Sequence, residues 1–119
     1  MSYVCVIDTN TKMIKKDIFS PELQKLSEIA KAISHPARLA ILIYLAETKT
    51  CISGDISNHI PLSRSTVSQH LKELKAVDLI HGEIEGLKIN YCLCKDNILN
   101  FEAMMNDLFT TLKSSESSC

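Results

Sequence analysis

Cationic and hydrogen-bonding side chains recur along the segment from residue 63 to residue 75. If this segment is a helix, successive residues are rotated by about 100°. An arc of about 140° then holds three cations and three small or amide side chains: Arg64, Ser65, Ser68, Gln69, Lys72 and Lys75. The arc contains no carboxylate, although the chain has 14 Asp and Glu residues. Such a surface suits the major groove of DNA, where cations neutralise phosphates and Gln or Arg reads base edges.

The same segment has an apolar side opposite that arc, formed by Val67, Leu71 and Leu74. The pattern predicts a helix over residues 64–77, with Ser63 capping an amide near Ser65 or Thr66. A solvated amphipathic helix would show the same two faces, so the pattern alone leaves that interpretation open. The predicted DNA-binding residues are Ser63, Arg64, Ser65, Thr66, Ser68, Gln69, Lys72, Lys75 and, in the following hairpin, Lys88.

Two histidines near this surface receive separate predictions. His70 falls at the edge of the apolar arc, and we expect it to pack or hydrogen-bond rather than to read a base. His81 lies in the predicted hairpin with Lys88, and both could contact DNA backbone or be ordinary surface residues.

The rest of the chain predicts the elements that position this helix. Apolar spacing predicts helices over 21–34 and 36–47, the second of them buried on most sides, and a short helix over about 54–59 that stops before Pro61. Strands over 79–84 and 88–94 form a hairpin, and a last helix runs from a cap at Asp96 or Asn97 to Leu112. This order is mostly α with a small β-hairpin, which is a winged helix-turn-helix. We expect an arm over 1–20, the domain over 21–112 and a polar tail over 113–119.

Composition narrows the class of protein. The 119 residues fit one domain, and a net charge of −1 excludes a uniformly basic nucleic-acid binder but allows a local basic face. No apolar run approaches a membrane span of about 18 residues, and the N-terminus lacks a secretory signal. A Cys–His pair such as Cys51 and His59 is conceivable, but no nucleophile motif or phosphate loop is present. We therefore predict a cytoplasmic protein that is not an enzyme.

Five cysteines, an odd number, offer thiol chemistry: Cys5, Cys51, Cys92, Cys94 and Cys119. Alternation along a strand would place Cys92 and Cys94 on one face, about 6.5–7 Å apart. That separation is poor for a disulfide between them but suits two ligands of a soft metal ion. Buried structural cysteines and a thiol-redox switch are the alternatives.

Three segments resemble the ArsR/SmtB family of bacterial transcriptional repressors. Residues 35–42, HPARLAIL, resemble the opening of that family's second helix, and residues 62–74, LSRSTVSQHLKEL, resemble its recognition helix. Residues 84–86 and 89–91 are similar to its wing, and the resemblance covers about residues 21–112. It implies a homodimeric repressor in the bacterial cytoplasm, dimeric through its first and last helices, which binds operator DNA without a cofactor and leaves it when an inducer binds.

The resemblance also bears on the inducer. Thiophilic-metal sensors of the family carry the pattern ELCVCDL at the third helix, where this chain reads TCISGDI, with one cysteine slightly displaced. The family's zinc site on the last helix uses His, which residues 96–112 lack. The resemblance implies that a thiophilic ion (arsenite-like, cadmium or lead) is the inducer and that an arsenite-like ion binds three thiolates. In this chain Cys51 with Cys92 or Cys94, or with Cys5 reaching across the dimer, could supply them. A redox or reactive-sulfur sensor, or a winged-helix interaction module without metal sensing, is the alternative.

Overall fold

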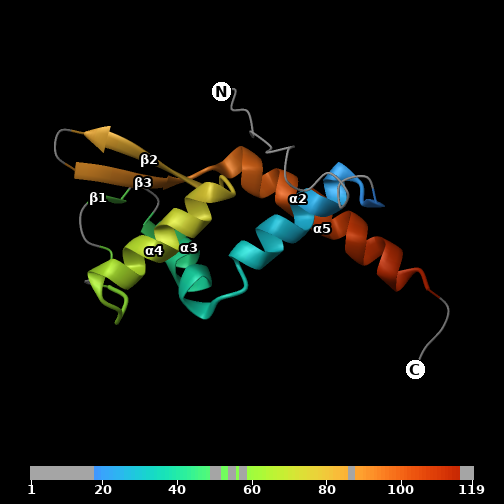
Figure 1. The fold of residues 1–119 in the computed structure, drawn as a ribbon, viewed down its shortest axis with the longest axis horizontal. Helices are drawn as coiled ribbons and strands as arrows, with labels where there is room; N and C mark the ends of the chain where they lie inside the picture. The colour runs from blue at the N-terminus through green and yellow to red at the C-terminus, as the bar shows by residue number, and fades with distance from the viewer. Residues whose placement is uncertain (1–17, 49–51, 54–55, 57–58, 86–87, 116–119) are drawn as a thin grey trace.

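The computed structural model describes residues 18–48, 52–53, 56, 59–85 and 88–115 (Figure 1). Its elements are α2 (Pro21–Ala32), α3 (Pro36–Thr48), β1 (Ile52–Ser53), α4 (Arg64–Ala76), β2 (Ile80–Glu85), β3 (Lys88–Leu93) and α5 (Lys95–Lys113). This is the mostly helical fold with a small hairpin that the sequence predicts. The predicted short helix over 54–59 lies largely outside the described residues.

The helices begin where local chemistry can satisfy their free amides. Ser20 accepts a hydrogen bond from the Leu23 amide at 3.2 Å, and Pro21 occupies the first turn of α2. Ser63 accepts from the Thr66 amide at 3.3 Å, as predicted for α4. The last helix is present as predicted, but its predicted cap at Asp96 or Asn97 is wrong, because the N-cap of α5 is Cys94, which makes no side-chain capping bond. Asn97 instead donates its side-chain amide to the Asp78 carbonyl at 2.8 Å, which ties α5 to the end of α4.

The sheet has three antiparallel strands in the order β1-β3-β2. The β2–β3 pair forms the wing, with Ile80 opposite Leu93 and His81 opposite Cys92. Strand β1 adds Ile52 opposite Tyr91 and was not predicted, since two residues are too few for a periodic signal. Strand β3 ends at Leu93, so Cys94 lies outside the strand in which the sequence placed it.

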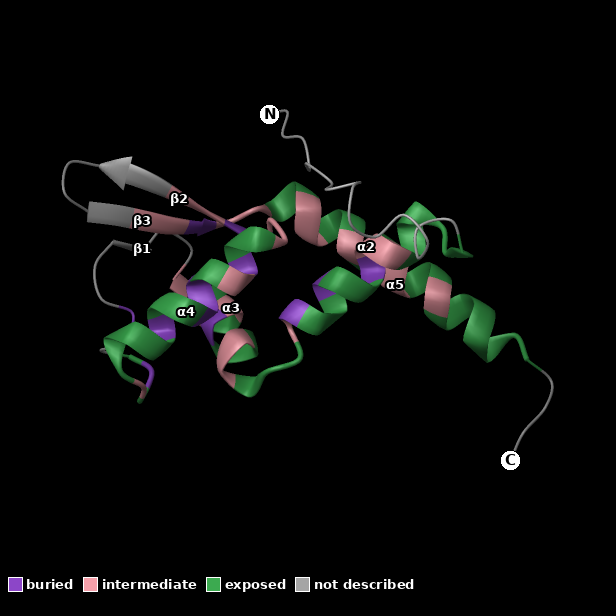
Figure 2. Ribbon diagram, in the orientation of Figure 1, coloured by how far each residue is buried: buried purple, intermediate pink, exposed green. Residues whose placement is uncertain are grey.

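The hydrophobic core lies between α3, α4 and the start of the wing (Figure 2). Ile41, Leu74, Leu79 and Ile80 are its largest fully buried side chains. Helix α3 buries Ile41 and Leu45 but leaves Leu39 and Ile43 exposed, so the expectation that it is buried on most sides is wrong for the single chain. Its apolar run is nearly continuous, whereas one protomer covers only one side of it.

Helices α2 and α5 pack against each other (Figure 1), and both reach the core: Ile29 of α2 belongs to it, and Ile98 and Phe101 of α5 pack against it. Helix α5 has no buried residue, although it carries many large apolar side chains. The Cα radius of gyration is 16.7 Å, larger than the value of about 13.5 Å expected for a compact chain of this length. None of the described helices could span a membrane by itself; only α2 and α3 taken together reach the required length and apolar content, and they are bent by 91°.

Candidate nucleic-acid interface and thiol site

Helix α4 separates its polar and apolar sides as the sequence predicts. Its buried residues are Val67, His70, Leu71 and Leu74. All eight predicted DNA-binding residues between positions 63 and 75 are exposed: Ser63, Arg64, Ser65, Thr66, Ser68, Gln69, Lys72 and Lys75. Lys88 begins strand β3, and its side chain lies outside the described part. The core therefore fixes one side of α4 and presents the acid-free arc to solvent.

The start of α4 is organised by hydroxyl groups. The Ser63 hydroxyl lies 3.0 Å from the Thr66 hydroxyl and 3.3 Å from the Ser65 hydroxyl. With the bond from the Thr66 amide, these contacts hold the first turn in place. The partial positive charge of a helix N-terminus, together with Arg64 beside it, suits a phosphate.

Gln69 has a partner that sequence reasoning missed. Its side-chain amide donates to the Glu73 carboxylate at 3.2 Å. The pair is spaced i, i+4 on one helix, a spacing at which Gln and acidic side chains commonly meet, so this signal was available in the sequence. The contact uses one of the two amide hydrogens of Gln69, so the other hydrogen and the side-chain oxygen are left for a base.

His70 joins α4 to α2 and α3 through Arg38. Arg38 donates from Nε to His70 Nδ1 at 3.1 Å and from Nη1 to the Ala32 carbonyl at 3.0 Å. The His35 ring lies 4.5 Å from the His70 ring, centroid to centroid. Because Nδ1 accepts, the His70 ring is neutral with its proton on Nε2. The expectation that His70 packs or hydrogen-bonds is confirmed.

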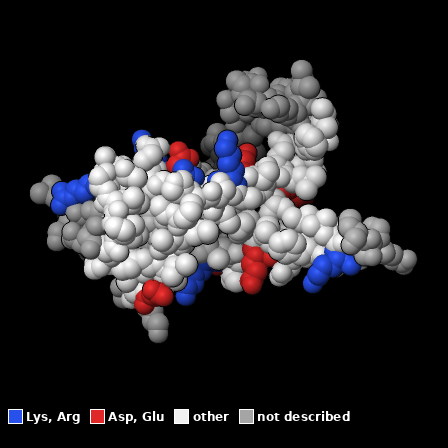
Figure 3. Space-filling view, turned by 90° about the horizontal axis from the view of Figure 1, so that it is seen from below, with Lys and Arg blue, Asp and Glu red and all other residues white. Residues whose placement is uncertain are grey.

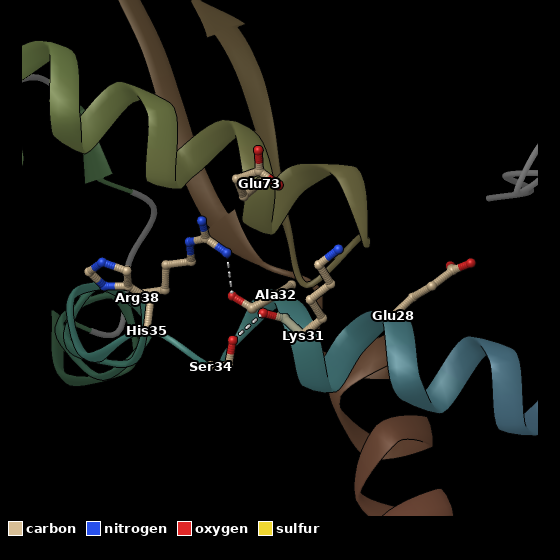
Figure 4. A pocket seen from close by; sticks show the side chains of 7 residues that line it. All are labelled: Glu28, Lys31, Ala32, Ser34, His35, Arg38 and Glu73. Carbon is tan, nitrogen blue, oxygen red and sulfur yellow. Dashed lines mark hydrogen bonds between the residues drawn. The ribbon is translucent and has the colours of Figure 1, made fainter.

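The surroundings of His70 oppose its protonation. Burial lowers the pKa of His70 below its ordinary value of 6.5, the nearby His35 and Arg38 lower it further, and Glu73 acts in the opposite direction. Arg38, His35, Lys31, Glu28 and Glu73 line an open hollow of about 520 Å³ beside this junction (Figure 4). No pattern in the sequence pairs Arg38 with His70, since the contact depends on how α3 packs against α4.

Charge is sparse on the lower face of the molecule. Among the described residues seen there, separate groups of Lys or Arg and of Asp or Glu lie on a largely uncharged surface (Figure 3). With a net charge of −1 the chain as a whole is not basic, and its Lys and Arg side chains form only local groups. Most of the predicted DNA contacts lie on α4 and its N-cap, and Lys88 lies in the wing.

The two described cysteines are in different chemical states. Cys92 is buried and disulfide-bonded, with a partner that lies outside the described residues. Cys94 is a free thiol whose sulfur lies 3.1 Å from His81 Nδ1. Burial raises the pKa of the Cys94 thiol, and the negative charge of Asp78 raises it further. The two cysteines that the sequence placed together on one strand face therefore differ in chemical state: one is a disulfide and the other a free thiol.

The predicted metal ligands are not gathered into a centre in the described part. No three His, Cys, Asp or Glu side chains among these residues lie together in a way that could hold a metal ion. Cys5 and Cys51, predicted as further ligands, lie outside the described residues. His81 faces Cys94, so its ring takes part in the thiol site and not in the α4 surface.

A winged helix-turn-helix whose second helix exposes an acid-free arc defines a class of DNA-binding regulators, and comparison with known proteins agrees. Residues 35–81 match the family described as bacterial regulatory protein, arsR family. The transcriptional regulator CmtR of Mycobacterium tuberculosis is 32% identical over 73 residues, 61% of each chain. The nodulation protein NolR of Rhizobium meliloti is 30% identical over 93 residues, 75% of each chain.

The fold comparison gives the same result. The structure of HlyU from Vibrio cholerae, which has also been solved in a reduced form, superposes with a TM-score of 0.61 at 26% identity. That match covers 77% of this chain and 99% of HlyU. The chain spans about three fifths of the length of CmtR. This protein belongs to the ArsR family, whose members are transcriptional regulators and not enzymes.

Proposed function

We propose that this protein is a homodimeric transcriptional repressor that sets α4 of each protomer in the major groove of operator DNA. The observation that carries the proposal is the exposed arc of α4, which has three cations, no carboxylate and a firmly buried opposite side. Lys88 of the wing would contact flanking backbone. Residues 21–112 would form the DNA-binding unit, with 1–20 as an arm and 113–119 as a tail, in the bacterial cytoplasm.

The apolar surface of α2 and α5 supports a second copy as partner. Leu99 and Leu112 of α5 are each 59% exposed, Phe109 is 48% exposed, and Phe19 before α2 is 52% exposed. Large apolar side chains gathered in this way on a water-soluble chain mark an interaction surface. Two half-sites about 34 Å apart in DNA require two such domains, which a symmetric dimer supplies.

The repressor would be released by a thiophilic metal or metalloid ion, such as arsenite, cadmium or lead, bound by cysteine thiolates. The candidate ligands remain Cys51, Cys92, Cys94 and Cys5; Cys94 is a free thiol, whereas Cys92 would bind an ion only after its disulfide is reduced. An ion can shift the protein away from DNA only if it binds the non-binding dimer geometry more tightly than the DNA-binding one. No cofactor would be needed for DNA binding itself.

The DNA-binding role is tested with the double variant Arg64→Ala/Gln69→Ala on the DNA fragment upstream of the gene. Since a good base contact contributes about 1–3 kcal/mol, we expect affinity to fall about 30-fold or more. The matched control, Lys113→Ala/Asn106→Ala, removes the same types of side chain from α5 and should leave affinity unchanged.

Salt dependence separates a DNA reader from a protein-interaction module. Four cations on each of two protomers, the three of the α4 arc and Lys88, predict a slope of about −7 for log affinity against log salt. Unchanged binding by the Arg64→Ala/Gln69→Ala variant would overturn the recognition-helix assignment. Absence of any salt-dependent DNA binding by the wild type would favour the interaction module.

The disulfide of Cys92 favours a second candidate, a thiol-redox or reactive-sulfur sensor of the same fold. In that case a dithiol reductant would transfer two electrons and two protons to the Cys92 disulfide, giving two thiols while the reductant becomes a disulfide. Peptide mapping under non-reducing conditions would identify the partner among Cys5, Cys51 and Cys119.

One titration distinguishes the two sensors. Arsenite, cadmium, lead and zinc are added to fully reduced protein while thiolate-to-metal absorption and DNA release are followed. Release by a metal supports the first candidate. Release by peroxide or a polysulfide, with no response to metals, supports the second; no response to either shows that the thiols are structural.

A further inference from the structure

We propose that His81 and Cys94 together form a binding site for a soft metal ion at the junction between the wing and α5. The site pairs an imidazole from β2 with a thiol from the N-cap of α5. Its existence can be tested without DNA; only its regulatory consequence rests on the proposed repressor function.

Backbone geometry holds the two side chains together. The pairing of β2 with β3 places Ile80 opposite Leu93. The Cys94 amide donates to the Leu79 carbonyl at 2.9 Å, which continues the ladder by one further bond past the end of β3. His81 and Cys94 are therefore positioned by main-chain bonds, and the 3.1 Å contact between Nδ1 and Sγ follows from that arrangement.

The separation of the two atoms suits shared coordination. Typical ligand distances of about 2.3 Å to sulfur and 2.0–2.1 Å to nitrogen place the two ligand atoms about 3.6 Å apart around a tetrahedral ion. The observed contact of 3.1 Å would need to open by about 0.5 Å. Thiolate and imidazole are the ligands that soft and borderline ions prefer.

The surroundings leave room for an ion. An open cavity of about 650 Å³ adjoins the pair and is lined also by the carboxylates Asp78 and Asp96, by one cation, Lys95, and by Asn97. The Asp78 charge that disfavours a thiolate at Cys94 would be compensated by a bound cation. Because the protein supplies two ligands, water or a small anion would occupy the other coordination positions of the ion. On binding, the sulfur–metal bond replaces the S–H bond, and the proton passes to solvent.

An ion at this site would lie between the end of α4 and the start of α5. Helix α4 runs through Asp78 and Leu79 into β2, and β3 runs through Cys94 into α5 (Figure 1). An ion held by His81 and Cys94 would connect the end of the recognition helix to the start of the helix proposed for dimerisation. Fixing that junction would set the spacing of the two recognition helices.

The experiment uses Cd²⁺ with the full-length protein, without reductant so that the Cys92 disulfide stays intact. We expect thiolate-to-cadmium absorption and a shift of the His81 ring nitrogen signals on titration. Cys94→Ser removes one of the thiols that can bind cadmium and should therefore weaken the thiolate-to-cadmium absorption. Because even the loss of a group that supports a ligand weakens metal binding about 10–100-fold, His81→Gln should weaken cadmium binding at least tenfold. The control is His59→Gln, which should bind as the wild type does; Cys5, Cys51 and Cys119 are left unchanged because one of them pairs with Cys92.

Two results would overturn the site. One is an unchanged absorption band in Cys94→Ser; the other is a wild-type spectrum in which the His81 signals do not respond to Cd²⁺, a reading that does not depend on whether any variant folds. DNA binding is measured separately with the fragment upstream of the gene. Cadmium binding at His81 and Cys94 without DNA release would uphold the site and count against metal-controlled repression.

Discussion

At the scale of single residues, His70 is the polar contact through which the recognition helix meets α3. Its side chain is 7% exposed, and its Nδ1 atom accepts the Arg38 bond only while the ring is neutral. Protonation would remove that acceptor and place a cation beside Arg38 and His35, with Glu73 as the opposing charge. The orientation of α4 is therefore coupled to the protonation state of one ring.

This coupling predicts a pH dependence of stability. Because the pKa of His70 is lowered in the folded state, the unfolded chain binds more protons once the pH falls below about 6.5. The stabilisation from neutral His70 is therefore present above pH 6.5 and is lost as the pH falls from there through the lowered folded-state pKa. Denaturant unfolding between pH 5 and pH 8 measures this loss.

His70→Gln provides the comparison, since its amide oxygen can still accept from Arg38 but does not titrate. We expect the variant to show a smaller decline of the unfolding free energy below pH 6.5 than the wild type does. His59→Gln, at an exposed ring stacked on Tyr44, is the control and should keep the wild-type slope. If the unfolding free energy of His70→Gln falls below pH 6.5 as much as that of the wild type, His70 is not the group responsible for the decline.

At the scale of elements, the N-cap of α4 is the local feature on which the recognition helix depends. Replacing Ser63 by Ala removes the acceptor of the Thr66 amide, which should lower the unfolding free energy by about 1 kcal/mol. For a domain of this size that corresponds to a fall in Tm of about 4–8 °C in a thermal melt.

Ser65→Ala is the matched control for the cap. Ser65 also carries a hydroxyl in the first turn, but its described contact is to the Ser63 hydroxyl and not to a backbone amide. Its Tm should stay within about 2 °C of the wild type, because exposed substitutions away from caps change stability by about 0.5 kcal/mol or less. Equal effects of the two variants would show that the cap does not stabilise α4.

At the scale of the whole molecule, α2 and α5 carry large apolar side chains that the single chain leaves exposed. Leu112→Glu places a charge in the proposed interface, and a charge buried without a partner strongly opposes association. We expect light scattering to give twice the protomer mass for the wild type and the protomer mass for the variant.

Leu39→Glu makes the same substitution on α3, where Leu39 is 44% exposed but lies on neither α2 nor α5. This variant should remain dimeric. A dimer broken by Leu39→Glu and kept by Leu112→Glu would move the interface from α5 to α3. A monomeric wild type would remove the basis for two-fold DNA binding.

The sequence by itself determined the features that follow from local rules. Ser63 caps α4, the residues of its acid-free arc are exposed, Val67, Leu71 and Leu74 are buried, and the hairpin pairs as its alternation predicts. Each of these features depends only on residues within one or two turns of a helix or on the two strands of one hairpin. Over such short stretches, the spacing of residues along the chain decides which way their side chains point.

The tertiary structure decided the contacts between distant residues. Arg38 meets His70 across 32 positions and His81 meets Cys94 across 13, and these distances depend on helix packing and strand register. The start of α5 also depends on tertiary contacts. Its N-cap is Cys94, and Asn97, one of the two predicted caps, instead donates its side-chain amide to the Asp78 carbonyl. Spacing along the chain fixes which face a side chain occupies, but only packing fixes which side chain it meets.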